Sequence, residues 1–78
     1  MSARNNFWLN VNRLKSPDVY AILNDQERLQ LTDSIKDVHS SNMLSNPTES
    51  FKWATDMITV VNDRINGLQK NHFKMYRQ

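Results

Sequence analysis

Few side chains in this sequence have the types and spacing that catalysis or metal binding requires. The two histidines, His39 and His72, are far apart in the chain. Asp33 and Asp37 stand one helical turn apart, but the neighbouring Lys36 suits an ordinary surface ion pair. There is no cysteine, and a single glycine cannot form a phosphate-binding loop. We therefore expect no catalytic residues, no metal site and no cofactor, and we predict that the protein is not an enzyme.

A group of cations and aromatic rings near the C-terminus is a stronger candidate for recognition. It consists of Lys70, Phe73, Lys74, Tyr76 and Arg77. Cations interleaved with rings can contact phosphates and stack on bases, and the same residue types are enriched in protein interfaces. The pattern also suits an anionic membrane surface, although it covers only one or two amphipathic turns. The simplest alternative is the solvated end of a helix.

Charge is arranged in three blocks along the chain. Residues 1–15 carry +3, residues 16–50 carry −4 and residues 51–78 carry +3, which gives a net charge of +2. The first block owes its charge to Arg4, Arg13 and Lys15. A dedicated nucleic-acid domain usually has a larger basic excess, and mixed solvated faces are the plainer interpretation. Nucleic-acid binding by a dimer, through the basic N-terminal arm and the C-terminal tail, is our second hypothesis.

Residues 16–35 offer a second possible recognition site, as a helix-turn-helix motif, and a structural assembly subunit is our third functional hypothesis. Ala21 would take the small-residue position, and Asp25 the turn position that glycine usually occupies. The second helix would then present acids, among them Asp33 and Asp37, to the phosphates of the nucleic acid. Like charges repel, so the pattern argues against this motif.

The elements that must position these groups are helices, and the last one is the best defined. From residue 51 onward, apolar residues recur at alternating steps of three and four. Position a of the heptad holds Phe51, Ile58, Ile65 and His72, and position d holds Ala54, Val61, Leu68 and Met75. Branched residues at a with Val or Leu at d favour a two-stranded helical seam. We therefore expect residues 47–78 to form a long helix that packs against another, in this chain or in a partner.

Both ends of this helix carry sequence signals. Asn46, Pro47 and Glu49 predict its start, while Asn66 and Gly67 are a candidate C-terminal cap. The heptad nevertheless runs through Gly67 in register, and one interior glycine costs only about 1 kcal/mol. We favour a continuous helix, about 46 Å long, with any bend near Gly67. A compact globule of this length has a radius of gyration of about 11–12 Å, so the helix must project or pair with a partner.

Three shorter helices are expected before it: residues 6–14 with Asn5 or Asn6 as the cap, residues 17 to about 23, and residues 25 to about 40. Asn24 and Glu27 have the spacing of a capping box at the start of the third. On one continuous helix, the apolar residues of the second and third segments would lie roughly 120–150° apart. This phase difference favours two separate helices.

The expected fold class is therefore all-α, with residues 1–78 forming a single small domain of about four helices. A core of this size usually reaches about 3–5 kcal/mol without a disulfide, a metal or a partner subunit. No apolar run approaches the ~20 residues of a membrane span, and the N-terminus lacks the apolar core of a signal peptide. We therefore expect a cytoplasmic protein without a membrane span.

We predict a non-enzymatic interaction or regulatory protein that acts by binding another protein and that forms a homodimer. The predicted oligomer interface is Ile58, Val61, Ile65, Leu68, His72 and Met75. The ten asparagines are typical of AT-rich genomes such as those of phages and plasmids. If the chain is phage-encoded, the expected compartment is the host cytoplasm.

Overall fold

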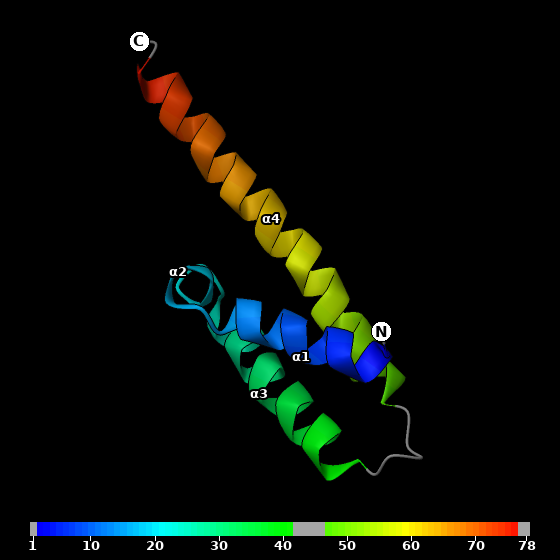
Figure 1. Ribbon diagram of the computed structural model, residues 1–78. Helices are drawn as coiled ribbons and strands as arrows, with labels where there is room; N and C mark the ends of the chain where they lie inside the picture. The colour runs from blue at the N-terminus through cyan, green and yellow to red at the C-terminus, as the bar shows by residue number, and fades with distance from the viewer. Residues whose placement is uncertain (1, 42–46, 77–78) are drawn as a thin grey trace.

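The computed structural model describes residues 2–41 and 47–76, with side chains described as far as Leu68. Four helices account for most of this part of the chain, which contains no strand: α1 (Ala3–Leu14), α2 (Pro17–Tyr20), α3 (Asp25–Ser40) and α4 (Thr48–Tyr76) (Figure 1). The all-α prediction is confirmed, as is the long C-terminal helix. α3 has the predicted bounds, whereas α1 begins earlier and α2 ends earlier than predicted.

Local hydrogen bonds explain these boundaries. Ser2 Oγ accepts a bond from the backbone N–H of Asn5 at 3.1 Å, so Ser2 is the cap of α1 and the prediction of Asn5 or Asn6 was wrong. The predicted capping box of α3 is confirmed, because Asn24 Oδ1 accepts from the Glu27 N–H at 2.8 Å and Glu27 Oε1 accepts from the Asn24 N–H at 2.9 Å. α2 is a single turn, and the chain after it tightens into three-residue bonds such as Leu23 N–H to Tyr20 O.

The start of α4 lies one residue later than predicted. The carbonyl oxygen of Pro47 accepts from the N–H of Phe51 at 3.1 Å, so Pro47 precedes the first helical residue. Asn46, the predicted cap, lies outside the described residues. α2 would be the first helix of the helix-turn-helix motif considered for residues 16–35, but it is only one turn long, which argues further against that motif.

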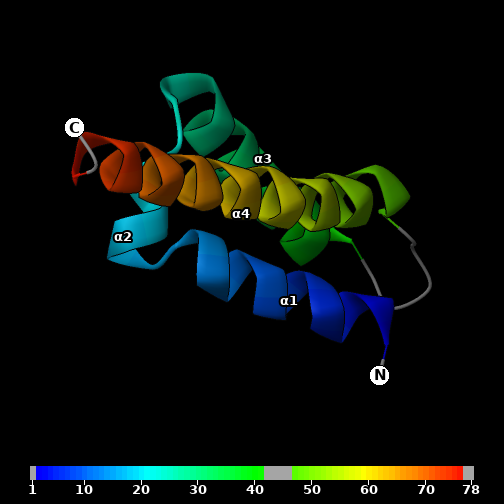
Figure 2. The ribbon, with the colours of Figure 1, turned by 90° about the horizontal axis from the view of Figure 1, so that it is seen from above.

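The core forms where α4 lies between α1 and α3 and contacts both (Figure 2). Its buried apolar residues come from all four helices and the turn after α2: Phe7, Val11, Leu14, Val19, Leu23, Leu31, Val38, Ala54, Met57 and Val61. The Phe7 ring packs edge-on against Trp8, with centroids 5.0 Å apart, and 5.6 Å from the Phe51 ring. This core occupies the first half of α4 and leaves the second half to project.

The projection of α4 gives the molecule an elongated shape (Figure 1). The helix has 29 residues and continues through Gly67, so it is about 44 Å long. The radius of gyration is 15.0 Å and the principal extents are 56 × 26 × 18 Å. A Cβ added at Gly67 would meet no neighbouring atom within 4 Å. Within the described residues, no helix is long and apolar enough to cross a membrane.

Candidate interaction site

The heptad positions of α4 change from buried to exposed along the helix. Val61 is fully buried, Ile58 and Ile65 are half-buried against the core, and the Leu68 residue is 58% exposed. The remaining predicted interface residues, His72 and Met75, lie on α4, but their side chains are outside the described part. The domain therefore covers the seam as far as Ile65 and leaves Leu68 open.

An ion pair attaches α4 to the start of α3 just before this exposed region. Arg64 Nη1 donates to Glu27 Oε1 at 2.6 Å, and Nη2 donates to Glu27 Oε2 at 2.8 Å. Nη1 also lies 3.3 Å from the carbonyl oxygen of Ile22, which accepts a bond. A two-point arginine–carboxylate pair of this kind fixes direction as well as distance. Arg64 therefore joins α4 to the start of α3 through one carboxylate and one backbone carbonyl.

The ion pair shifts the pKa of both side chains. The hydrogen bond from Arg64 lowers the pKa of Glu27, although partial burial acts in the opposite direction. The hydrogen bond to Glu27 raises the pKa of Arg64. The sequence interpretation missed this contact, because it identified Glu27 only as a capping residue. The available signal was Arg64 at heptad position g, where charges flank a seam.

The three basic residues predicted to form the N-terminal arm face different parts of the molecule. Arg4 donates to the carbonyl oxygen of Val38 at 3.4 Å and to Ser41 Oγ at 3.0 Å, at the C-terminal end of α3. Arg13 donates to Asn62 Oδ1 on α4 at 3.1 Å. Lys15 is exposed beside a groove between α1 and α3. The structure therefore does not gather them into one basic surface.

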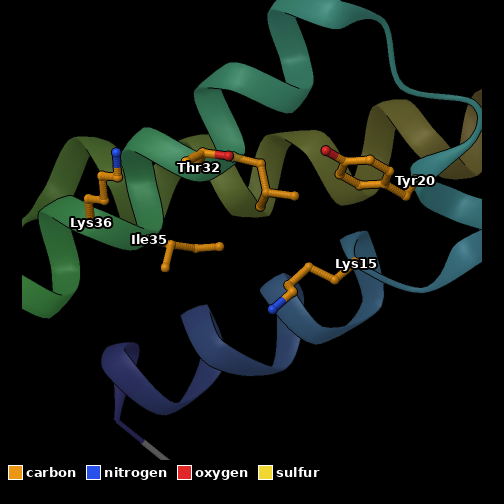
Figure 3. Close-up of a pocket in the computed structure, with 6 residues that line it drawn as sticks. Lys15, Tyr20, Thr32, Ile35 and Lys36 are labelled. Carbon is orange, nitrogen blue, oxygen red and sulfur yellow. The ribbon is translucent and has the colours of Figure 1, made fainter.

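That groove has a volume of ≈ 450 Å³ and is mostly apolar (Figure 3). Its lining residues come from the end of α1, from α2 and from one side of α3: Lys15, Tyr20, Leu31, Thr32, Ile35 and Lys36. α4 lies behind it, so the groove opens on the face opposite the long helix. No sequence pattern predicts this groove, because it depends on how α1 and α3 pack against α4.

The predicted C-terminal recognition residues belong to the end of α4 or follow it. Lys70, Phe73, Lys74 and Tyr76 are on the last turns of the helix, and Arg77 lies outside the described residues. Because side chains are described only as far as Leu68, the structure locates these residues by their backbone. They lie on the projecting part of α4, away from the core.

The described side chains include no group of three histidine or carboxylate residues that could hold a metal ion. No family model, no curated protein and no solved structure shows a significant match to the chain. The described residues form a small all-α fold with one projecting helix, whose apolar residues are covered as far as Ile65 and exposed at Leu68, and a separate apolar groove.

Proposed function

We propose that the chain is a small non-enzymatic interaction module that binds another protein through the projecting half of α4, and that a second copy is its first partner. The observation that carries this proposal is the exposure of Leu68, a seam position directly after the covered Ile65. The apolar pattern continues beyond the point where the domain covers it. A partner helix would complete the packing that the domain leaves unfinished.

Helix energetics support this interpretation. An isolated helix of fewer than about 12–15 residues is marginal in water, and most helical stability in proteins comes from packing of an amphipathic face. Among the described side chains, Ile65 is the last on α4 that packs against the core, and the helix continues to Tyr76. Branched and straight aliphatic residues at a and d are the types that pair helices in a two-stranded seam.

Nucleic-acid binding draws less support from the structure. Arg4 and Arg13, two of the cations that hypothesis requires, make hydrogen bonds within the domain. The cations of the α4 end would then have to carry most of the phosphate contacts. Such binding would weaken steeply with salt, whereas an apolar helix interface would not.

The experiment compares Leu68→Asp with the same change at two leucines of matched exposure. Leu68, Leu9 and Leu29 are 58%, 57% and 61% exposed, but only Leu68 lies on the seam. We expect sedimentation equilibrium to show that the wild-type chain dimerises as its concentration rises. A charge buried in an apolar interface costs several kcal/mol, so Leu68→Asp should abolish dimerisation.

The two control variants separate a specific seam from general surface stickiness. Leu9→Asp and Leu29→Asp should dimerise like the wild type, and all three variants should keep its thermal unfolding midpoint at concentrations where the wild type is monomeric. A wild-type monomer at hundreds of micromolar, or equal loss of association in all three variants, would contradict the proposal.

A further inference from the structure

The groove between α1 and α3 has the surface of a helix-binding site. Its floor is Leu31, which is 2% exposed, and the half-buried Ile35. The ring of Tyr20 forms the end near α2, and Lys36 stands at the opposite end (Figure 3). Thr32, Ile35 and Lys36 share this side of α3 because residues three and four apart lie on one face of a helix.

Two lysines border the groove. Lys15 lies at the end of α1 on one side, and Lys36 stands on α3 at the end away from Tyr20. Both are exposed, and among the described side chains no carboxylate lies within ion-pair distance of either lysine. Arg28 lies over the Tyr20 ring with its guanidinium carbon 5.0 Å from the ring centroid, but it pairs with Asp25 and adds no unpaired charge. The two lysines therefore make the edge positive, while the floor is apolar.

The acids of α3 do not neutralise this edge. Asp37 accepts a hydrogen bond from Ser50 Oγ of α4 at 2.7 Å, so it faces the opposite side of α3. Asp25 pairs with Arg28 at 3.6 Å, at the start of the helix. Asp33 lies three residues before Lys36 and so beside it on the helix surface, but no ion pair joins these two described side chains.

We propose that this groove binds an amphipathic helix of a partner protein whose apolar face is flanked by acidic residues. Its apolar side chains would pack on Leu31, Ile35 and Tyr20, and its carboxylates would pair with Lys15 and Lys36. Binding a helix through apolar anchors spaced three and four residues apart is a recurrent mode of peptide recognition. The groove is separate from the α4 seam, so this inference does not rest on the proposed dimer.

Charge complementarity selects this occupant over a second copy of the chain. The projecting end of α4 carries Lys70 and Lys74, followed by Arg77. If that segment of another copy entered the groove, its cations would approach Lys15 and Lys36. Like charges facing each other suppress a wrong partner, whereas glutamate and aspartate at the same positions would be attracted.

The test uses two fluorescently labelled helical peptides and the full chain. Both peptides carry leucines at positions i, i+3 and i+7; one has glutamates flanking this face and the other has lysines. We expect the acidic peptide to bind in fluorescence anisotropy, with amide shifts in two-dimensional NMR confined to the residues around Lys15, Tyr20 and Lys36. The basic peptide should not bind.

The double variant Lys15→Glu/Lys36→Glu reverses the edge without touching the core. It should weaken acidic-peptide binding by about tenfold or more and gain binding of the basic peptide. Lys52→Glu on α4 is the control for each single reversal, Lys15→Glu or Lys36→Glu: it makes the same charge change at an exposed lysine outside the groove and should leave binding unchanged.

Three results would overturn the proposal. They are no binding of the acidic peptide at millimolar concentration, an equal loss in Lys52→Glu and the double variant, and NMR shifts located elsewhere. Binding of a fatty acid in place of the peptide would assign the groove to a small apolar carboxylate instead. A loss of self-association in the double variant would assign it to a second copy. A circular dichroism melt of each variant confirms that the fold is intact.

Discussion

Arg64 and Glu27 form the contact that most clearly links the chemistry of single residues to the arrangement of the helices. The Glu27 residue serves two functions, because the same carboxylate completes the capping box of α3 and receives both nitrogens of Arg64. Its side chain is 12% exposed, while that of Arg64 is 37% exposed. The pair is therefore partly desolvated on the glutamate side and stronger than a fully solvated surface pair.

Replacing Glu27 with Gln should lower stability in a pH-dependent way. Glutamine keeps the acceptor of the capping box but removes the charge that pairs with Arg64. Because Arg64 is partly exposed to solvent, we expect the free energy of unfolding to fall by only about 1 kcal/mol at neutral pH. That loss corresponds to about 4–8 °C in melting temperature for a domain of this size. Asp25→Asn is the control. It removes a charge from the same helical turn, but the Asp25 carboxylate is solvent-exposed and pairs with Arg28 at 3.6 Å. This substitution should change the melting temperature little.

The pH dependence has a definite sign. Pairing lowers the pKa of Glu27 in the folded state from the ordinary value of 4.5. Its stabilisation is therefore complete above that value and is lost as pH falls through the lowered folded-state pKa. The difference in melting temperature between wild type and Glu27→Gln should shrink at pH 3. A difference that stayed constant between pH 7 and pH 3 would show that the charge of Glu27 is not what Arg64 requires.

α3 and α4 show what local sequence signals can predict about elements. The start of α3 was predicted because a capping box and an apolar phase change are local features, and the structure has the capping box at that position. The start of α1 was missed because Ser2, Asn5 and Asn6 are all good caps, and sequence alone does not rank them. α2 was predicted too long because the switch to three-residue hydrogen bonds depends on how the turn packs.

α4 continues through Gly67, so a substitution at Gly67 tests whether the helix is continuous there. A Cβ at Gly67 would meet nothing within 4 Å, so Gly67→Ala changes only the backbone preference. Alanine is favoured over glycine in a helix interior by about 1 kcal/mol. We expect greater helicity by circular dichroism and a higher melting temperature. A decrease in either quantity would mean that the chain bends at Gly67 and needs the freedom of glycine there.

The site was less predictable than the helices, because it depends on contacts between distant parts of the chain. The heptad identified α4 as an interaction element, but it could not show that the domain covers Val61 and Ile65 and leaves Leu68 exposed. The groove beside Lys15 and the Arg64–Glu27 pair both arise from the packing of α1, α3 and α4. Neither has a signature within one segment of sequence.

At the level of the whole molecule, the core and the projecting end of α4 should be separable. We expect removal of residues 70–78 to leave the melting temperature nearly unchanged, because among the described side chains of α4 the last buried one is Val61 and the last packed one is Ile65. The same truncation should weaken binding of the natural partner, since it removes the cations and rings of the tail. Calorimetry of the truncated chain provides the measurement, with helicity per residue by circular dichroism as the control.

A decrease of more than roughly 5–8 °C, which corresponds to about 1 kcal/mol in a domain this small, would assign the tail to the structural core. If the truncated chain binds the partner with unchanged affinity, the interface lies on residues 1–69. The two readouts are independent, so either half of this expectation can fail alone.

The elongated shape also affects how the assembly state has to be measured. A compact protein with a radius of gyration of 15.0 Å would contain about 155 residues, close to twice the 78 of this chain. Gel filtration calibrated with globular standards would therefore assign the monomer an apparent mass near that of a dimer. Light scattering or native mass spectrometry avoids this error, because neither infers mass from the dimensions of the particle.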